Sequence, residues 1–510
     1  MKVPSTAAPW ILALALPAAY VWGQPSEPPA ATPTPTPTAT VRPPQPPPPL
    51  EPVFRNGFFP LTADGKNELR IAGSVHLDAR GYFGQSVAPS SLDIRRARLE
   101  LQGRVYQFVT FRIQASLEDN PHIRNAYWDV EVTHALHVRL GQMKVPFSTE
   151  WLTLDNQVNS LERGASQPVY PFFDRGVMVW GQLASQTVTY SLGLYNGSGV
   201  DLDTPKGDTG GGKEVAIRLF SQPWRQHSAS YLRGLYLVAQ ATAAGEPVPT
   251  RRYETSGMSA ANYESLIWRW RTEQVIGSNG RWSDHITAEM TSRRRWGVEA
   301  LLLEGPLGVS FEYCEVRWGD ITIFFHDFYA GSQRLRHEPV LTRGGAARSA
   351  ALWASWFLTG KGKTLDTHGW RQPNPQRNWR PDAGGGAWEV LAPFAFTDTD
   401  RQPFDAVTVN GFTGAQLGTP GPVPVGEGGA VTASVVDGAW KAATATVGLN
   451  WTLNPALRVQ MEATEVWARD LDQGKGGLIS GGHSNLAHAT QRNWQVEHEL
   501  MLGMRFIFRI

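Results

Sequence analysis

Apolar and polar residues alternate with a period of two through most of the chain from about residue 69 onward. A period of two is typical of β-strands whose two faces meet different surroundings, whereas helices repeat every 3.6 residues. The sequence therefore predicts an all-β fold. The pattern is clearest in these segments: RIAGSVHLDARG (70–81), RRARLELQGRV (95–105), FVTFRIQASLE (108–118), AYWDVEV (126–132) and LRVQMEAT (457–464).

Two architectures produce such alternation. A β-sandwich buries its apolar face against a second sheet, whereas a transmembrane barrel turns that face to lipid and its polar face to an aqueous lumen. The polar face here is densely charged in strand after strand, which favours the barrel. The last segment, LMLGMRFIFRI (500–510), alternates in the same way, and we expect it to pair with the first strand and close the barrel.

The connections between the predicted strands alternate in length. Those near Tyr106, His134 and Ser185 are very short, whereas residues 81–91 and 144–175 form long ones. Short periplasmic turns and long outer loops are typical of outer-membrane barrels, although the connection at residues 120–123 is shorter than this rule predicts. At roughly ten residues per strand plus turns and loops, residues 54–510 predict a barrel on the order of 16 strands, wide enough for a water-filled channel.

The N-terminal region differs in composition from the barrel. Residues 1–23, MKVPSTAAPWILALALPAAYVWG, combine one lysine with a short apolar stretch and predict a secretory signal peptide, with an uncleaved anchor helix as the alternative. Residues 24–53 contain PTPTPTPT and PPQPPPP and predict an extended proline-rich periplasmic linker, which serves either as a stalk or as a simple tether. We expect residues 54–510 to form the barrel domain.

Composition excludes several classes of function. Lys and Arg (47) nearly balance Asp and Glu (46), so the net charge of +1 gives no reason to expect a nucleic-acid partner. A single cysteine, Cys314, excludes an internal disulfide and a cysteine-based metal cluster. No motif of a catalytic, metal or phosphate-loop site has its required setting, so we expect neither an enzyme nor a cofactor. The 20 tryptophans suit the aromatic girdles of a barrel.

Several motifs, in order along the chain, resemble the phosphate-selective porin O and P family. The segment RLGQMKVPFSTEWLTLDNQVNSLERG (139–164) is similar to the family's "GQxKxPF … ER" signature. Further matches are RGVMVWGQL…VTYSLGLYNGSG (175–199), GPLGVSFEYCEVRW (305–318), WFLTG (356–360), GGGAWEVLAPF (384–394) and VGLNWTLNPALRVQ (447–460). Together they cover nearly all of residues 70–510.

The resemblance implies a 16-stranded outer-membrane barrel, usually a homotrimer, that passes small anions such as phosphate by passive diffusion. It also implies that the third outer loop folds into the lumen and constricts the pore. Counting strands from Arg70, that loop is residues 144–175. One departure concerns selectivity: phosphate-specific members carry clustered lysines at the constriction, and here only Lys144 lies near it, while Lys361 replaces the acid of the family's FLTGE motif.

Positive charge at a narrow place in a low-dielectric wall selects anions. The predicted inward faces carry Arg70, Arg80, Arg96, Arg98, Arg104, Arg112, Arg139, Arg458, Arg505 and Arg509. Our hypothesis is that Lys144 and Arg163 point into the lumen at the constriction, near Arg175. The approach would be formed by Arg98, Arg112 and Arg139. The alternative is that these cations pair with neighbouring carboxylates and only hold the wall and the loop in place.

Two further functions stay open at this point. A general or carbohydrate-permeable porin would have the same barrel, and tryptophans lining the lumen would favour it. A secreted, tryptophan-rich β-sandwich that binds glycans would explain the alternation and the tryptophans, but it leaves the charged face of most strands unexplained. The barrel predicts an outer-membrane location in a Gram-negative type of envelope, with membrane lipid and small anions as partners.

Overall fold

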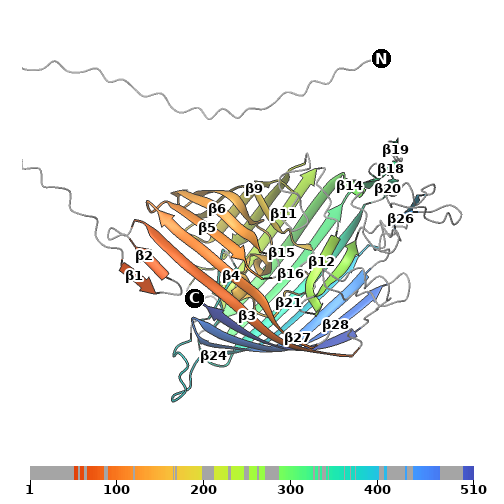
Figure 1. Ribbon diagram of the computed structural model, residues 1–510. Helices are drawn as coiled ribbons and strands as arrows, with labels where there is room; N and C mark the ends of the chain where they lie inside the picture. The colour runs from red at the N-terminus through yellow and green to blue at the C-terminus, as the bar shows by residue number, and fades with distance from the viewer. Residues whose placement is uncertain are drawn as a thin grey trace, which may run out of the picture. The chain divides into compact units, whose positions relative to one another are not determined.

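A computed structural model gives the fold of the chain (Figure 1). All described residues lie in the compact unit Pro48–Ile510. The predicted signal peptide and most of the predicted linker lie outside the described residues. The structure describes residues 51–54, 58–61, 66–84, 90–118, 121–164, 166, 169–197, 212–227, 231–245, 252–260, 263–269, 286–325, 328–330, 333–335, 340–342, 344–360, 362–367, 369–373, 375–400, 407–409, 431–433, 440–470 and 498–510. Among these residues, none belongs to a helix with the length and apolar character needed to span a membrane.

Sixteen of the described strands pair antiparallel with their neighbours in a closed ring. The predicted transmembrane barrel is therefore confirmed, and a two-sheet sandwich is excluded because these sixteen strands form one closed sheet rather than two sheets packed face to face. In chain order the strands are β3 (Glu68–Gly84), β4 (Ser91–Val105), β5 (Val109–Ser116), β6 (His122–Thr133), β7 (Leu136–Lys144), β8 (Phe173–Leu183), β9 (Val188–Tyr195), β10 (Glu214–Ser221), β11 (Leu235–Gly245), β15 (Ser292–Glu304), β16 (Leu307–Trp318), β21 (Gly345–Phe357), β24 (Ala387–Thr399), β27 (Trp440–Asn454), β28 (Leu457–Asp470) and β29 (His498–Arg509).

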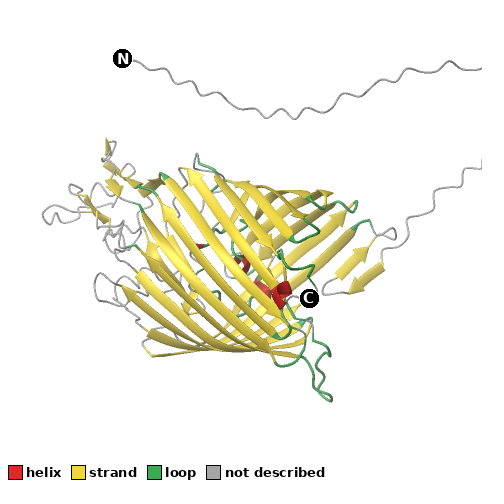
Figure 2. Cartoon of the chain, turned by 180° about the vertical axis from the view of Figure 1, so that it is seen from behind, coloured by secondary structure: helices red, strands yellow, loops and turns green. Residues whose placement is uncertain are grey.

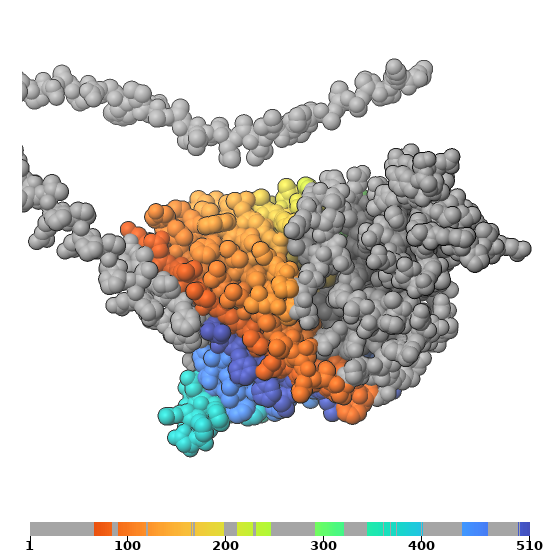
Figure 3. Space-filling model, in the orientation of Figure 1, coloured from red at the N-terminus to blue at the C-terminus, as the bar shows by residue number. Residues whose placement is uncertain are grey.

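The last strand closes the barrel on the first, as the sequence predicted. Strand β29 pairs with β3 from Glu499 opposite Gly84 to Arg509 opposite Ser74. The backbone of Ile510 extends this pairing, because its N–H donates to the carbonyl of Gly73 at 3.0 Å. In Figure 3 the blue β29 and the red-to-orange β3 and β4 lie side by side on the outer wall.

Burial on the strands follows the alternation in the sequence, with the apolar face outside. Leu99 and Trp128 are 45% and 56% exposed, whereas their neighbours Arg98 and Asp129 are 8% and 3% exposed. A soluble protein shows the opposite arrangement, with its apolar side chains buried. An apolar outer band and a charged interior are what a bilayer outside and water inside require.

The short connections are tight turns at one end of the barrel, called here the turn side. Tyr106 and Gln107 have φ of 50° and 69°, and Ala184 and Ser185 have φ of 50° and 53°. These left-handed conformations let two strands reverse direction within a few residues. The predicted long connection at residues 81–91 is wrong at its start, because pairing with β29 continues β3 through Gly84.

The remaining described elements lie between the barrel strands or before β3. The hairpin of β1 (Glu51–Phe54) and β2 (Phe58–Leu61) pairs with β3, so the last residues of the predicted linker lie in a strand. Small separate sheets contain β12 (Arg252–Ala260) with β13 (Tyr263–Arg269); β14 (Ile286–Met290) with β17 (Ile321–Phe325) and β20 (Val340–Thr342); β18 (Phe328–Ala330) with β19 (Gln333–Leu335); β22 (Thr364–Asp366) with β23 (Gly369–Arg371); and β25 (Val407–Val409) with β26 (Val431–Ala433). The helical turns are α1 (Thr149–Leu152), η1 (Asp155–Gln157) and η3 (Tyr231–Gly234).

Candidate functional site

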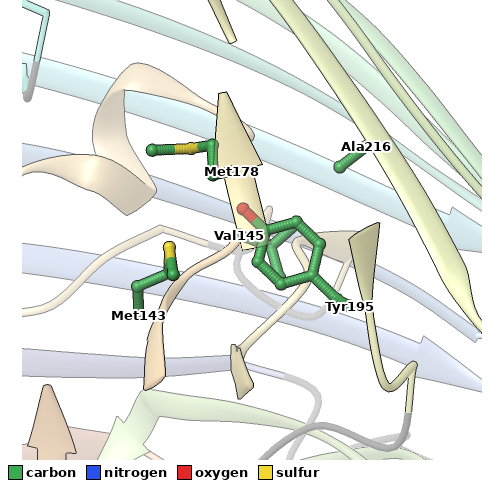
Figure 4. Close-up of a cluster of buried hydrophobic side chains, with 5 residues drawn as sticks. All are labelled: Met143, Val145, Met178, Tyr195 and Ala216. Carbon is green, nitrogen blue, oxygen red and sulfur yellow. The ribbon is translucent and has the colours of Figure 1, made fainter. Parts of the chain in front are cut away.

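The connection between β7 and β8, residues 145–172, folds into the lumen and is called here the inward loop. Figure 2 shows its short helices within the ring of strands. A cluster of buried apolar side chains fixes its beginning: Met143 and Val145 pack against Met178, Tyr195 and Ala216 of the adjoining strands β8 to β10 (Figure 4). This is the loop that the sequence placed after the fifth strand.

Acidic and amide side chains of the wall bind the backbone N–H groups of the inward loop. The N–H of Thr149 donates to both carboxylate oxygens of Glu299, at 3.0 and 3.1 Å. The N–H of Ser148 donates to Gln240 Oε1 at 2.9 Å, and that of Leu161 donates to a carboxylate oxygen of Glu462 at 2.9 Å. A loop inside a barrel cannot use sheet partners, so these side chains satisfy its buried donors.

Cationic side chains bind the backbone carbonyls of the same loop. Lys144 Nζ donates to the carbonyls of Trp151 and Thr153, at 2.6 and 2.9 Å. Arg163, which belongs to the loop itself, donates through Nη2 to the carbonyl of Thr153 at 2.8 Å and lies 3.1 Å from Asp155 Oδ1. Three further loop carbonyls accept hydrogen bonds from wall arginines: Val158 from Arg458, Leu161 from Arg505 and Asn156 from Arg509. Much of the inward-facing positive charge thus holds the loop in place.

The tip of the inward loop carries Glu162, which lies among four arginines of the wall. The shortest distances from its carboxylate oxygens to guanidinium nitrogens are 2.7 Å for Arg80 and Arg95, 3.2 Å for Arg96 and 3.3 Å for Arg505. Arg505 also forms a bidentate pair with Asp78, at 2.6 and 2.8 Å. These pairs bind the loop to β3, β4 and β29, where the barrel closes.

The carboxylate of Glu162 stays ionised in acid. Burial alone would raise its pKa, but the surrounding guanidinium groups, led by Arg95 and Arg96, hold the pKa well below the usual 4.5. A carboxyl whose pKa is depressed in the folded protein contributes its full stabilisation when the pH is above the ordinary pKa. The contribution declines as the pH falls below the ordinary pKa, and it is lost as the pH falls through the depressed pKa.

We therefore expect the tip of the loop to stay bound as the pH falls through the usual carboxyl pKa, and single-channel conductance to rise only at a pH well below 4.5, where Glu162 is protonated and the tip is released. Conductance of the protein in a planar bilayer, followed as the pH is lowered, measures this. In the variant Glu162→Gln, which has no carboxylate at this position, the rise should be absent or already present at neutral pH. A rise in the wild type between pH 6 and pH 5 would contradict the assignment.

A second segment enters the lumen from the turn side, where the sequence predicted only short turns. The connection between β21 and β24, residues 358–386, carries the hairpin of β22 and β23. The N–H of Trp370 donates to Thr153 Oγ1 of the inward loop at 2.9 Å. The Trp370 ring packs on Trp353 of β21 at 4.8 Å between centroids, within a buried apolar cluster that includes Phe220, Val238 and Leu301. This turn-side hairpin fills one part of the lumen with apolar side chains.

An open chamber of about 730 Å³ remains on the turn side, along β3 to β8. Residues 154–157 of the inward loop and Arg371 of the turn-side hairpin border it. Seven arginines and five Asp or Glu side chains line it among the described residues, so its wall has an excess of positive charge. A water-filled space of this kind, narrowed by two inserted segments, suits the passage of small solutes.

The structure separates the six predicted site residues into two groups. Arg98, Arg112 and Arg139 line the open chamber. Each is paired: Arg98 with Glu118, Arg112 with Glu100 at 2.6 Å, and Arg139 with Asp129 at 2.6 Å.

Lys144 and Arg163 lie at the inward loop and bind its carbonyls, as described above. Arg175 is exposed and shares a face of β8 with the outward-facing Val177, and its Nε donates to Gln142 Oε1 at 3.2 Å. The constriction hypothesis for these three cations remains a prediction.

Several residues that hold the inward loop were not singled out from the sequence. Glu299 and Gln240 lie in strands whose alternation is clear, but nothing local indicates that their partners are backbone N–H groups about 90 to 150 residues away. Trp370 and Gly369 lie in a connection on the turn side, where the sequence predicted only short turns. Among the described residues, no group of three or more His, Cys, Asp or Glu side chains has the arrangement of a metal site.

Comparison with known protein families gives one match. The family model of the phosphate-selective porins O and P covers residues 68–477, from the first barrel strand to beyond β28. The chain belongs to the phosphate-selective porin O and P family. It is therefore an outer-membrane β-barrel channel and not an enzyme. A comparison with curated protein sequences found no match.

Solved porin structures are similar to this porin at low identity. An anion-selective porin from Comamonas acidovorans is 11% identical, with a TM-score of 0.44 over 87% of this chain and 100% of that one. OmpT of Vibrio cholerae is 8% identical, with a TM-score of 0.43 over 87% and 98%. The outer-membrane channel DcaP of Acinetobacter baumannii is 10% identical, with a TM-score of 0.41 over 88% and 99%. The family assignment rests on the family match alone.

Proposed function

We propose that this porin is a passive, anion-favouring diffusion channel, with inorganic phosphate among the anions that it admits. The observation that carries the proposal is the excess of arginine over carboxylate in the wall of the turn-side chamber. Fixed positive charge in a narrow, low-dielectric passage raises the local concentration of anions and lowers that of cations. Family membership supports the same conclusion.

Arg98, Arg112 and Arg139 form the anion pathway in this proposal, because all three border the open chamber. Lys144 and Arg163 act mainly by holding the inward loop, and their charge adds to the positive potential at the constriction. Arg175 would act only at a distance. Each pathway arginine has a carboxylate neighbour, so the preference for anions should be modest. The homotrimer implied by the family resemblance remains part of the proposal.

In this proposal the channel prefers anions to cations, but it discriminates only weakly between phosphate and other anions. The described lysines inside the barrel include Lys144, bound to loop carbonyls, and Lys363, which forms a buried pair with Glu389 at 2.8 Å. Neither ammonium group is therefore positioned for a free phosphate ion. Lys361, the other lysine of the FLTGK motif, lies outside the described residues.

The reversal potential across a planar bilayer under a KCl gradient tests the proposal. We expect the reversal potential to have the sign of a channel that prefers chloride to potassium, because the wall of the chamber carries more guanidinium than carboxylate groups. The variant Arg112→Gln should move the reversal potential toward zero, since it leaves the negative charge of Glu100 in the chamber without its arginine partner. Phosphate added to the same bilayer should lower the chloride current if phosphate enters the pathway.

The matched control is the double variant Glu100→Gln with Arg112→Gln, which removes one charge of each sign. Its reversal potential should equal that of the wild type. A wild-type reversal potential near zero would favour the alternative function, a general porin without charge preference. A reversal potential with the sign of cation selectivity would overturn the proposal.

A further inference from the structure

Four side chains form a continuous stack on the inner wall of β6, β7 and β8, where they border the turn-side chamber. The guanidinium carbon of Arg139 lies 4.4 Å from the ring centroid of Tyr127 and 5.6 Å from that of Trp180. Trp180 also stacks on His137, with 4.0 Å between centroids and 22° between ring planes. All four residues line the chamber. The order of the stack is therefore Tyr127, Arg139, Trp180, His137.

A single carboxylate holds this stack together. Asp129 Oδ2 accepts from Arg139 Nε at 2.6 Å and from Trp180 Nε1 at 2.8 Å, and its Oδ1 lies 3.2 Å from His137 Nδ1. Asp129 itself is only 3% exposed. The carboxylate thus fixes the plane and direction of the guanidinium group before any ligand arrives, which lowers the entropy cost of binding.

Arg139 borders the chamber, and its two Nη groups are the part of the guanidinium that Asp129 does not bind. Asp129 binds its Nε, and in the part of the chain that the structure describes no hydrogen-bond or ion-pair partner is found for Nη1 or Nη2. Two parallel N–H groups in one plane match the two oxygens of a carboxylate. The rings of Tyr127 and Trp180, both in contact with the guanidinium group, supply apolar surface beside this fork.

The charges around the stack favour a monovalent ligand. Asp129 and Glu131 both lie in the chamber wall on β6, next to Arg139 of β7, and Glu100 lies in the same wall two strands further on, on β4. Carboxylates so close to the fork repel a divalent phosphate more strongly than a singly charged carboxylate. The chamber volume of about 730 Å³ is also in the range of pockets that hold small organic molecules.

We propose that the stack of Tyr127, Arg139, Trp180 and His137 is a binding site for small aromatic carboxylates that pass through the turn-side chamber. The carboxylate pairs with the Nη edge of Arg139, and the ring of the ligand packs against the neighbouring aromatic side chains. This inference rests on the proposed anion channel and names one class of solute for it.

Blocking of the chloride current by small anions tests the inference. The full-length porin in a planar bilayer at pH 7.5 is titrated with benzoate, acetate and inorganic phosphate. Benzoate should reduce the current at about one-tenth of the concentration that acetate requires, because acetate lacks the ring that packs on the stack. Acetate and benzoate carry the same charge, so an effect of charge alone would act on both.

Two variants locate the site. In Arg139→Lys the positive charge stays but the planar fork is lost, and the half-blocking concentration of benzoate should rise about tenfold. In Tyr127→Leu one ring is lost without breaking the pair with Asp129, and benzoate should again bind more weakly. The matched control is Arg104→Lys: Arg104 also lines the chamber and pairs with Glu68, but it is not part of the stack.

The outcomes distinguish this inference from the proposed function. If the reversal potential favours chloride but benzoate and acetate block alike, the channel proposal stands and the aromatic site is refuted. The aromatic site is likewise refuted, and the channel proposal stands, if Arg139→Lys and Arg104→Lys weaken the block by benzoate equally. Retention of the heat-dependent gel mobility of the folded barrel shows that each variant folds, so that a loss of blocking reports on the site.

Discussion

The variant Arg505→Leu is expected to release the tip of the inward loop and to raise single-channel conductance severalfold. Arg505 is fully buried, pairs with Asp78 and Glu162, and donates to the carbonyl of Leu161. With leucine at this position, Asp78 loses one of its arginine partners and the Leu161 carbonyl loses its hydrogen bond from β29. Breaking a buried ion pair from one side costs about 3–5 kcal/mol, because a charge stays buried without compensation.

Conductance in a planar bilayer measures the release of the loop, and urea titration of the detergent-solubilised barrel measures the loss of stability. The control is Arg104→Leu, which removes an arginine of the same inner wall whose side chain is 43% exposed and lies 3.4 Å from Glu68. A half-exposed pair contributes at most about 1 kcal/mol, so this control should unfold nearly as the wild type does. Wild-type conductance and stability in Arg505→Leu would show that the remaining contacts hold the loop without it.

The variant Gly369→Val is expected to separate the turn-side hairpin from the inward loop and to widen the channel. A Cβ atom at Gly369 would lie 2.3 Å from Thr153 Oγ1 and 2.7 Å from Thr153 Cα, which no side chain can occupy. The φ of Gly369 is also +102°, a conformation that costs a non-glycine residue about 1–3 kcal/mol. The hairpin therefore has to move, and the hydrogen bond from Trp370 to Thr153 is lost.

We expect the conductance of Gly369→Val to rise severalfold, while the barrel keeps its detergent-resistant fold because no barrel strand is altered. The matched control is Gly384→Ala in the same connection. Gly384 also has a positive φ, +62°, but a Cβ atom there would meet no atom within 4 Å. Backbone strain without a clash should leave conductance unchanged. An equal rise in both variants would show that strain in the connection, rather than contact with Thr153, sets the width of the lumen.

Taken by itself, the sequence determined the architecture of this porin. The alternation of Leu99 with Arg98 and of Trp128 with Asp129 already separates a lipid-facing from a water-facing surface, because side chains on a strand change face at every residue. The same reasoning placed the long connection after the fifth strand and the last strand against the first, because these features depend on local patterns that are readable without knowing what lies across the barrel. That the long connection folds into the lumen was implied only by the family resemblance.

The tertiary structure alone decided which charges face solute and which hold the loop. Arg505 and Arg112 look alike in the sequence, since each is an arginine on the inward face of an amphipathic strand. They differ because the inward loop covers one and leaves the other open to the chamber, and the partner of Arg505 at Leu161 is 344 residues away in the chain.

The turn-side hairpin escaped prediction for a related reason. Its docking depends on Trp370 meeting Trp353 and Thr153, and nothing within residues 358–386 indicates that the segment turns inward. The stack around Arg139 is intermediate: the alternation assigned Arg139 to the inward face, but its packing with Tyr127, Trp180 and His137 depends on the register of β6, β7 and β8. Pairing across strands, which no local pattern contains, is what converts inward-facing residues into a site.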